Sequence, residues 1–565
     1  MTFKSVKLLG RSAQLMGAAA LIFGLTACEG ADTAAVPQVK PAVASAAEIG
    51  RRIERLASDE FEGRGPSTAG GRAASQYIAD EMAASGLEPM GENGSYFQTV
   101  ELTESSVSSE STMAIKSNGK TLIDADQKTN AVYWTKRLSN SIDIAETDMI
   151  FVGYGVVAPE YNWDDYAGVD VKGKTVVMLV NDPGFATGDE DMFKGQSMTY
   201  YGRWTYKFEE AGRQGAAAAI IIHQTKPASY GWDVVQGSWT GKQYDLVRPD
   251  KGASRTQIEG WVHLDAAKDM FKAAGKDINA AIASAATPEF KAFTLPNLTL
   301  DASLKQSVKT TKSRNVAGGV RGTERPDEYV LYMAHWDHLG KNEDAEGDDK
   351  IWNGAVDNAT GTAVILEIGE AFVQQGPPER SAIFIAVTAE ESGLLGSAYY
   401  AEDPLVPLNK TVAGINIDAI LPIGKTKDMI VVGYGASELE DRLKAVIEPR
   451  GMYIVPDPKP EAGYYYRSDH ISLAKKGVPM LYADSGNDHV VNGRSFGEAY
   501  SEEYTKERYH KPGDEYDNSW DLSGIEATTE ILYELGYGIA NEDEWLNWYE
   551  GSEFRALRDK MLDNN

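Results

Sequence analysis

The chain has 565 residues, of which 42% are hydrophobic and 10% aromatic. This length and composition predict a globular protein of about two to four domains with well-packed cores. The formal net charge is −29. Because binding to a nucleic acid backbone needs a basic face, this charge argues against nucleic acid as a partner.

The first 27 residues have the features of a secretory signal. A basic start with Lys4, Lys7 and Arg11 precedes an apolar stretch of 13 residues, Leu15 to Ala27. A helix that crosses a membrane needs about 18 apolar residues or more, so this stretch is too short to span. We therefore expect residues 1–27 to be a cleaved signal peptide.

The end of the signal, Leu25-Thr26-Ala27-Cys28, resembles the lipobox of bacterial lipoproteins. In such proteins the cysteine becomes the lipidated first residue of the mature chain. Cys28 is also the only cysteine, which excludes an internal disulfide. An ordinary signal cleaved near the same place is the alternative. Both interpretations predict an exported protein of the periplasm or cell envelope, and the first adds membrane attachment through lipid on Cys28.

The sequence pattern divides the rest of the chain into four segments. Residues 28–46 are rich in Ala, Pro and Val without periodicity, as is typical of a tether. Residues 47–128 begin with helical periodicity and reach a strand at Tyr96 to Leu102. Residues 129–290 consist of short β-like runs among Gly-rich and aromatic loops, and we interpret them as an inserted domain. Residues 291–565 return to alternating strands and helices.

The last segment predicts an α/β fold. Its expected strands have five to eight residues and are separated by amphipathic helices, which favours a mostly parallel mixed sheet sandwiched by helices. The expected strands are Tyr329 to Ala334, Ala382 to Thr388, Val412 to Ile417, Met429 to Val432 and Pro479 to Ala483, with helices starting at Gly361 and Leu394. In such sheets ligands collect at the carboxyl ends of the strands.

Five polar positions of this segment lie at expected strand ends, helix starts or turns. They are His335, Asp357, the pair Glu390-Glu391, Asp418 and His510. Taken singly, such an Asp is usually a cap and such a His a loop residue. Taken together, two imidazoles and three carboxylates have the number and type of ligands that a pair of Zn²⁺ ions needs.

The order of these motifs resembles the co-catalytic di-zinc aminopeptidase family, which includes bacterial leucyl aminopeptidases, aminopeptidase Y and glutamate carboxypeptidase II. The motifs are H-x-D at His335, D-N-A-T-G at Asp357, E-E at Glu390, N-x-D ending at Asp418 and Y-H-x-P at Tyr509. Two stretches of the predicted insert, Phe151 to Gly155 and Gly173 to Val180, resemble the protease-associated domain that interrupts some exopeptidases.

The resemblance implies a role for each matching residue. Asp357 is expected to bridge two Zn²⁺ ions, with His335 and Asp418 completing one ion and Glu391 and His510 the other. Glu390 is expected to be the general base. Asp337 is expected to accept the other ring N–H of His335, and Tyr509 to donate its hydroxyl to the developing oxyanion.

Other residues are weaker candidates. Arg467 is expected to contact a substrate carboxylate or carbonyl, or to form a structural ion pair. His338 and His489 are candidate pocket residues, and spare loop histidines are the alternative.

The predicted function is removal of N-terminal residues from peptide substrates by a zinc-dependent exopeptidase. The alternatives are a carboxypeptidase or dipeptidase of the same family, a glutaminyl cyclase-like transferase with one zinc, and a receptor-like protein without catalysis. Side-chain preference and oligomeric state are not predicted from the sequence.

Overall fold

The computed structural model describes residues 44–239, 241–343 and 347–563. The predicted signal peptide and Cys28 lie outside the described residues. Among the helices of the described ranges, none is both long and apolar enough to cross a membrane.

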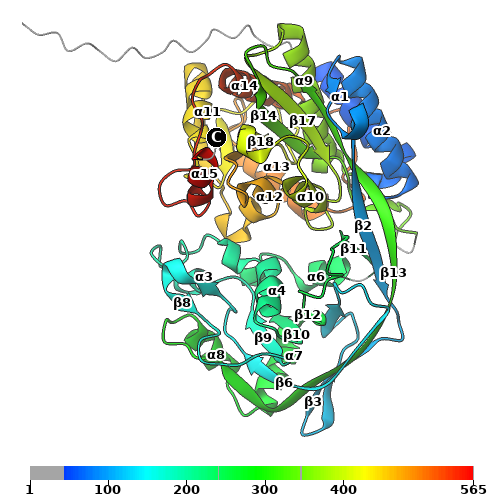
Figure 1. Ribbon diagram of the computed structural model, residues 1–565, viewed down its shortest axis with the longest axis vertical. Coiled ribbons are helices and arrows are strands. Elements are labelled where there is room, and N and C mark those ends of the chain that lie inside the picture. The colour runs from blue at the N-terminus through cyan, green and yellow to red at the C-terminus, as the bar shows by residue number, and fades with distance from the viewer. Residues whose placement is uncertain (1–43, 240, 344–346, 564–565) are drawn as a thin grey trace, which may run out of the picture. The chain divides into compact units, whose positions relative to one another are not determined.

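One sheet holds the strands predicted for the last segment (Figure 1). Four parallel strands form its centre in the order β17-β14-β18-β21. Antiparallel strands flank them, β13 and then β2 beyond β17, and β19 beyond β21. The bounds are β2 (Phe97–Val107), β13 (Phe293–Val320), β14 (Arg325–His335), β17 (Arg380–Val387), β18 (Thr411–Asn416), β19 (Asp428–Val432) and β21 (Met480–Ser485). The predicted α/β class with a mixed, mostly parallel sheet is confirmed.

Helices cover both faces of this sheet, and the side chains of β14 show how. Val330, Tyr332 and Ala334 pack into the core under one helical layer, whereas Leu331 and Met333 pack into a second core on the opposite face. Because both faces are buried, the strand is continuously apolar instead of alternating. The first layer contains α1 (Ala46–Leu56), α9 (Gly361–Gln375) and α14 (Ser523–Ala540), and the second contains α10 (Leu395–Glu402) and α12 (His470–Ala474).

The N-terminal helices follow the predicted periodicity. Ile49, Ile53 and Leu56 of α1 are fully buried against α9 and α14. Ser45 caps α1 by accepting a hydrogen bond from the Glu48 N–H. The second helix is α2 (Ala69–Ala84), and Thr68 caps it by accepting a hydrogen bond from the Gly71 N–H.

A second sheet pairs with the first half of β13. Residues 293–305 of β13 pair with β6 (Ser141–Phe151) and β3 (Thr112–Ser117), whereas residues 306–320 pair with β2 and β17 in the first sheet. Parallel strands β9 (Thr175–Leu179), β10 (Ala218–Ile222) and β12 (Ile258–Val262) continue from β6. This sheet has hydrophobic cores of its own.

Three strands, β3, β4 (Lys120–Asp124) and β11 (Lys242–Leu246), do not follow the expected limits of the insert at residues 129 and 290; β4 pairs with β3. β3 precedes residue 129 and pairs in the second sheet, and β11 lies between the limits but pairs with β2. The domain boundaries stay a prediction.

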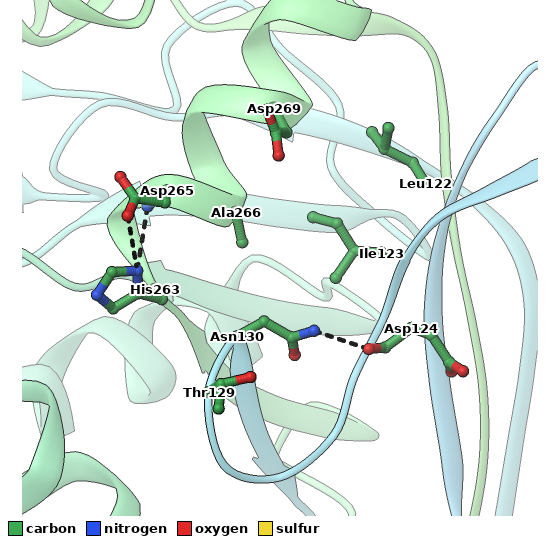
Figure 2. A pocket seen from close by; sticks show the side chains of 9 residues that line it. All are labelled: Leu122, Ile123, Asp124, Thr129, Asn130, His263, Asp265, Ala266 and Asp269. Carbon is green, nitrogen blue, oxygen red and sulfur yellow. Dashed lines mark hydrogen bonds and ion pairs between the residues drawn. The ribbon is translucent and has the colours of Figure 1, made fainter.

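A cavity of about 430 Å³ opens beside the second sheet (Figure 2). His263 lines it and precedes α7 (Leu264–Ala273), where its Nδ1 accepts a hydrogen bond from the Asp265 N–H at 3.3 Å. The ring therefore acts as a helix cap.

Candidate metal centre

The predicted polar residues come together where the central parallel strands end. His335 is the last residue of β14, Glu390 and Glu391 follow β17, and Asp418 follows β18. His335 pairs in register with Val387, the last residue of β17. Because adjacent parallel strands place their carboxyl ends at one edge, these side chains meet there.

Asp357 lies between the two predicted halves of the centre. Its Oδ1 is 3.2 Å from His335 Nε2, and its Oδ2 is 3.2 Å from His510 Nε2. The side chain comes from the turn Ala355–Thr360 that leads into α9. The backbone N–H groups of Val356 and Asp357 donate to the buried Asp514 carboxylate at 3.0 and 3.1 Å, which fixes this turn.

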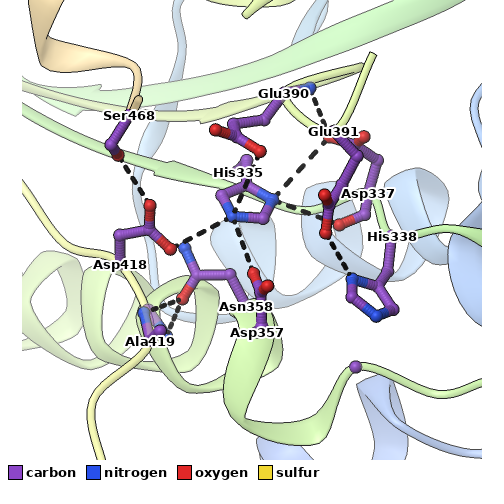
Figure 3. A network of polar contacts seen from close by, with 12 residues as sticks. His335, Asp337, His338, Asp357, Asn358, Glu390, Glu391, Asp418, Ala419 and Ser468 are labelled. Atoms are coloured by element: carbon purple, nitrogen blue, oxygen red, sulfur yellow. Dashed lines mark hydrogen bonds and ion pairs between the residues drawn. The ribbon is translucent and has the colours of Figure 1, made fainter. Parts of the chain in front are cut away.

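Two groups of ligand atoms share Asp357 (Figure 3). In the first group, His335 Nε2 is also 3.2 Å from Asp418 Oδ1. The second group consists of His338, Asp357 and Glu391, and His510 Nε2 lies beside it, 3.1 Å from Glu391 Oε2. The five predicted metal ligands are thus brought together, two on each side of one carboxylate.

The donor set fits zinc. Neutral imidazole and carboxylate oxygen are ligands that zinc prefers. The Nε2 of His338 is also buried and has no hydrogen-bond partner among the described residues. Burying such a group unpaired is costly, so its position points to a bound cation.

His338 contributes more to this centre than the sequence indicated. Its side chain is fully buried, and its Nδ1 is 2.6 Å from Glu391 Oε1. His510 contacts the other oxygen of Glu391, so the two imidazoles hold this carboxylate from both sides. Gly354 permits this position, because a Cβ there would come within 2.6 Å of the His338 ring. Only the closeness of His338 to His335 in the sequence signals this role.

Asp337 has a contact that the sequence did not predict. His335 Nδ1 lies 3.2 Å from the backbone carbonyl oxygen of Asp337 but 3.9 Å from the Oδ1 of its carboxylate. The carbonyl therefore holds the ring, and the carboxylate accepts a hydrogen bond from the Glu390 N–H at 3.0 Å. The Asp337 side chain thus also positions the Glu390 backbone, and its predicted action on the His335 ring stays a prediction.

Glu390 faces the same centre from the turn after β17. Its Oε2 is 3.9 Å from His335 Nε2, and its side chain is 10% exposed. Burial raises the pKa of Glu390 well above its ordinary value, and the carboxylates of Glu391 and Asp418 raise it further against the lowering effect of His335.

Tyr509 and Arg467 line a cavity that also contains Asp357, Glu390 and Asp418. The Tyr509 ring stacks on His510 with a centroid distance of 3.9 Å. The Arg467 guanidinium lies 5.2 Å from the centroid of the Tyr464 ring.

His489 does not have the position predicted for it. Its Nδ1 accepts hydrogen bonds from the N–H groups of Val491 and Asn492, and its ring packs on Phe496. The residue is buried in this turn and is absent from the wall of the cavity at the centre. The structure therefore gives His489 a structural role.

Arg64, which the sequence left without a role, lies directly under the centre. It is fully buried and donates hydrogen bonds to the carbonyl oxygens of Trp336, Leu56, Asn353 and Gly354. These bonds join α1 to the segments that carry His335 and Asp357. Burial lowers the pKa of Arg64 to about 10, although Asp514 and Asp337 oppose this shift.

We expect Arg64→Met to destabilise the protein by about 3 kcal/mol or more, because several buried carbonyls lose their donor at about 1 to 3 kcal/mol each. Urea unfolding measures this loss. Arg72→Met is the control, since Arg72 is exposed and donates to a single carbonyl, that of Ser67. Equal stability of the two variants would contradict a supporting role for Arg64.

The sheet with helices on both faces is a fold that this chain shares with a solved aminopeptidase. A solved structure of an aminopeptidase from Aneurinibacillus sp. strain AM-1 has this fold, with a TM-score of 0.51 and 18% identity over 89% of this chain and 95% of that one. Residues 315–536 match the family profile described as Peptidase family M28. This match agrees with the resemblance to the co-catalytic zinc aminopeptidase family that was found in the sequence.

Curated relatives match shorter parts of the chain. A glutamate carboxypeptidase 2 homolog of Caenorhabditis elegans is 25% identical over 49% of this chain and 38% of its own length. Aminopeptidase NAALADL1 of Mus musculus is 38% identical over 20% of this chain and 15% of its own length. The chain thus spans less than two fifths of the length of these relatives.

Proposed function

We propose that this protein is an exported zinc-dependent exopeptidase that removes N-terminal residues from peptides and binds two Zn²⁺ ions per chain. The observation that carries this proposal is the position of Asp357, which presents one carboxylate oxygen to His335 and the other to His510. A carboxylate placed in this way between two groups of ligands suits a pair of cations.

In this proposal His335 and Asp418 hold one ion, Glu391 and His510 hold the other, and Asp357 holds both. Bound zinc supplies Lewis-acid polarisation of the peptide carbonyl and lowers the pKa of water towards about 7. His338 keeps Glu391 in place through the carboxylate oxygen that His510 does not contact.

Glu390 is proposed as the group that moves the proton. Its carboxylate takes a proton from the attacking water and gives it to the leaving amine, which is the task of a general base that then acts as a general acid. The Tyr509 hydroxyl donates a hydrogen bond to the oxyanion that develops on the carbonyl oxygen. The position of Glu390 supports this role, because its carboxylate faces the centre without being one of the five predicted ligands.

Recognition of the amino end is proposed because the centre is lined with carboxylates that suit an ammonium group. Carboxypeptidase or dipeptidase action is the second candidate. Arg467 favours it, since a guanidinium in the same cavity suits a substrate carboxylate. The names of the two relatives include both kinds of activity.

A peptide library digested with the zinc-loaded protein and read by mass spectrometry tests this proposal. Loss of single residues from the amino end supports it, and loss from the carboxyl end supports the second candidate. Two zinc ions per chain without any cleavage would overturn the peptidase proposal. One zinc ion with cyclisation of N-terminal glutamine would identify a transferase. The absence of both bound zinc and turnover would identify a receptor-like protein.

We also propose that the protein is anchored to a membrane of the cell envelope by lipid on Cys28, and that the region of the second sheet is a protease-associated domain. The signal-like residues 1–27 support the first of these. Cys28→Ser should move the protein from the membrane fraction to the soluble fraction. Unchanged membrane association of this variant would contradict lipid anchoring.

A further inference from the structure

The cavity at the metal centre continues along the face of two strands. It measures about 220 Å³ and is lined by Asp418 of the centre as well as by residues of β19 and β21. Ile430 of β19 pairs with Asp484 of β21, and Val432 pairs with Tyr482. Alternate residues of a strand share a face, so these four side chains form one wall. A cavity of this size suits a single side chain instead of a larger ligand.

Asp484 is the acidic residue of this wall. Its Oδ1 is buried and has no hydrogen-bond partner in the part of the chain that the structure describes. A buried carboxyl oxygen without a donor points to a ligand that supplies one.

The other charged groups of the cavity have neighbours of their own. The Asp457 carboxylate accepts a hydrogen bond from the Lys459 N–H at 2.8 Å. The charge of the Lys459 side chain also attracts the same carboxylate. The Arg467 guanidinium lies against the Tyr464 ring. Asp484 interacts with the backbone N–H of Ser485 and lies beside the apolar residues Ile430 and Val432.

We propose that Asp484 selects peptides whose N-terminal residue has a cationic side chain, lysine or arginine. Ile430 and Val432 contact the alkyl stem of this side chain, and Asp484 accepts hydrogen bonds from its charged end. Lysine and arginine bury their stems on apolar surface while their charged ends keep polar partners. An α-amino group has no such stem, so the apolar wall favours a side chain as the occupant. This inference rests on the proposed aminopeptidase function.

Hydrolysis of lysyl and norleucyl anilides by the zinc-loaded protein tests it. The two substrates have unbranched side chains of similar length, but only the lysyl side chain ends in an ammonium group. We expect the wild-type protein to prefer the lysyl anilide by about tenfold or more in kcat/KM, since a charged hydrogen bond in a buried site discriminates by about this factor. In Asp484→Asn this ratio should fall about tenfold, and Asp484→Glu should restore part of it.

Asp488→Asn is the matched control. Asp488 lies four residues along the chain, outside the cavity wall, and already contacts Lys427 at 3.5 Å and the Tyr453 hydroxyl at 2.9 Å. In this variant the ratio of kcat/KM for the lysyl anilide to kcat/KM for the norleucyl anilide should equal the wild-type ratio. An unchanged ratio in Asp484→Asn would overturn the inference. This includes the case in which hydrolysis of both substrates slows equally, which would mean that Asp484 binds the α-amino group. Hydrolysis of neither anilide by the wild type would instead contradict the aminopeptidase function.

Discussion

Replacing Glu390 by Gln should leave two zinc ions bound and lower kcat by about 10²- to 10⁴-fold, the range that general acid-base catalysis supplies. Gln has nearly the same shape as Glu but cannot take a proton from water. The Glu390 side chain is buried, and its Oε2 is 3.9 Å from His335 Nε2, so it faces the centre without being one of the five predicted ligands. Single-turnover hydrolysis of an aminoacyl anilide and zinc analysis measure the two properties separately.

Glu402→Gln is the control for this experiment. Glu402 ends α10 on the surface, where its side chain is 71% exposed and pairs with Lys476. We expect this variant to keep wild-type turnover, because exposed ion pairs contribute little to stability or catalysis. Undiminished turnover of Glu390→Gln would remove Glu390 from the mechanism. Loss of zinc together with activity would show that Glu390 acts as a ligand.

The strands and helices around the centre were predictable because their signals are local. Apolar runs such as Val330 to Ala334 predict buried strands, and each run ends at or shortly before a polar residue. Parallel strands bring such residues to one edge, so the sequence order was enough to place His335, Asp357 and Asp418 together.

The contacts that tertiary structure alone decides were not predictable. The four carbonyls that Arg64 contacts come from segments up to 290 residues away, and no pattern around Arg64 identifies them. Asp337 was expected to bind the His335 ring through its carboxylate, but the backbone carbonyl is closer, at 3.2 Å. Which group of Asp337 contacts the His335 ring depends on the path of the backbone after β14. The spacing of residues in the sequence does not determine this path.

The extent of the second sheet was also not predictable from the sequence. β13 joins both sheets as one strand of 28 residues, Phe293–Val320, whereas the sequence suggested a boundary at residue 290, before this strand begins. A strand of this length has no turn signal where it passes from one sheet to the other. Hydrogen-bond pairing, and not composition, therefore determines which residues belong to each sheet.

Replacing Asp357 by Asn should abolish most zinc binding and, with it, activity. The substitution removes one negative charge and turns one of the two carboxylate oxygens into an NH₂ group, which cannot bind a cation. Each oxygen of Asp357 faces a different histidine at 3.2 Å, so this change weakens cation binding in both groups of ligands. Zinc per chain, measured by elemental analysis after dialysis, should fall from two to below one.

Asp543→Asn separates this effect from the general loss of a carboxylate. The Asp543 side chain is fully exposed and pairs with Arg325 on the surface, so this variant should keep both ions. Circular dichroism and urea unfolding establish that each variant is folded, because loss of a bound metal also lowers stability by mass action. If folded Asp357→Asn keeps two zinc ions, the carboxylate does not bridge them. If it keeps one ion at full affinity, Asp357 serves only one side of the centre, and the proposal of two ions around a shared carboxylate fails.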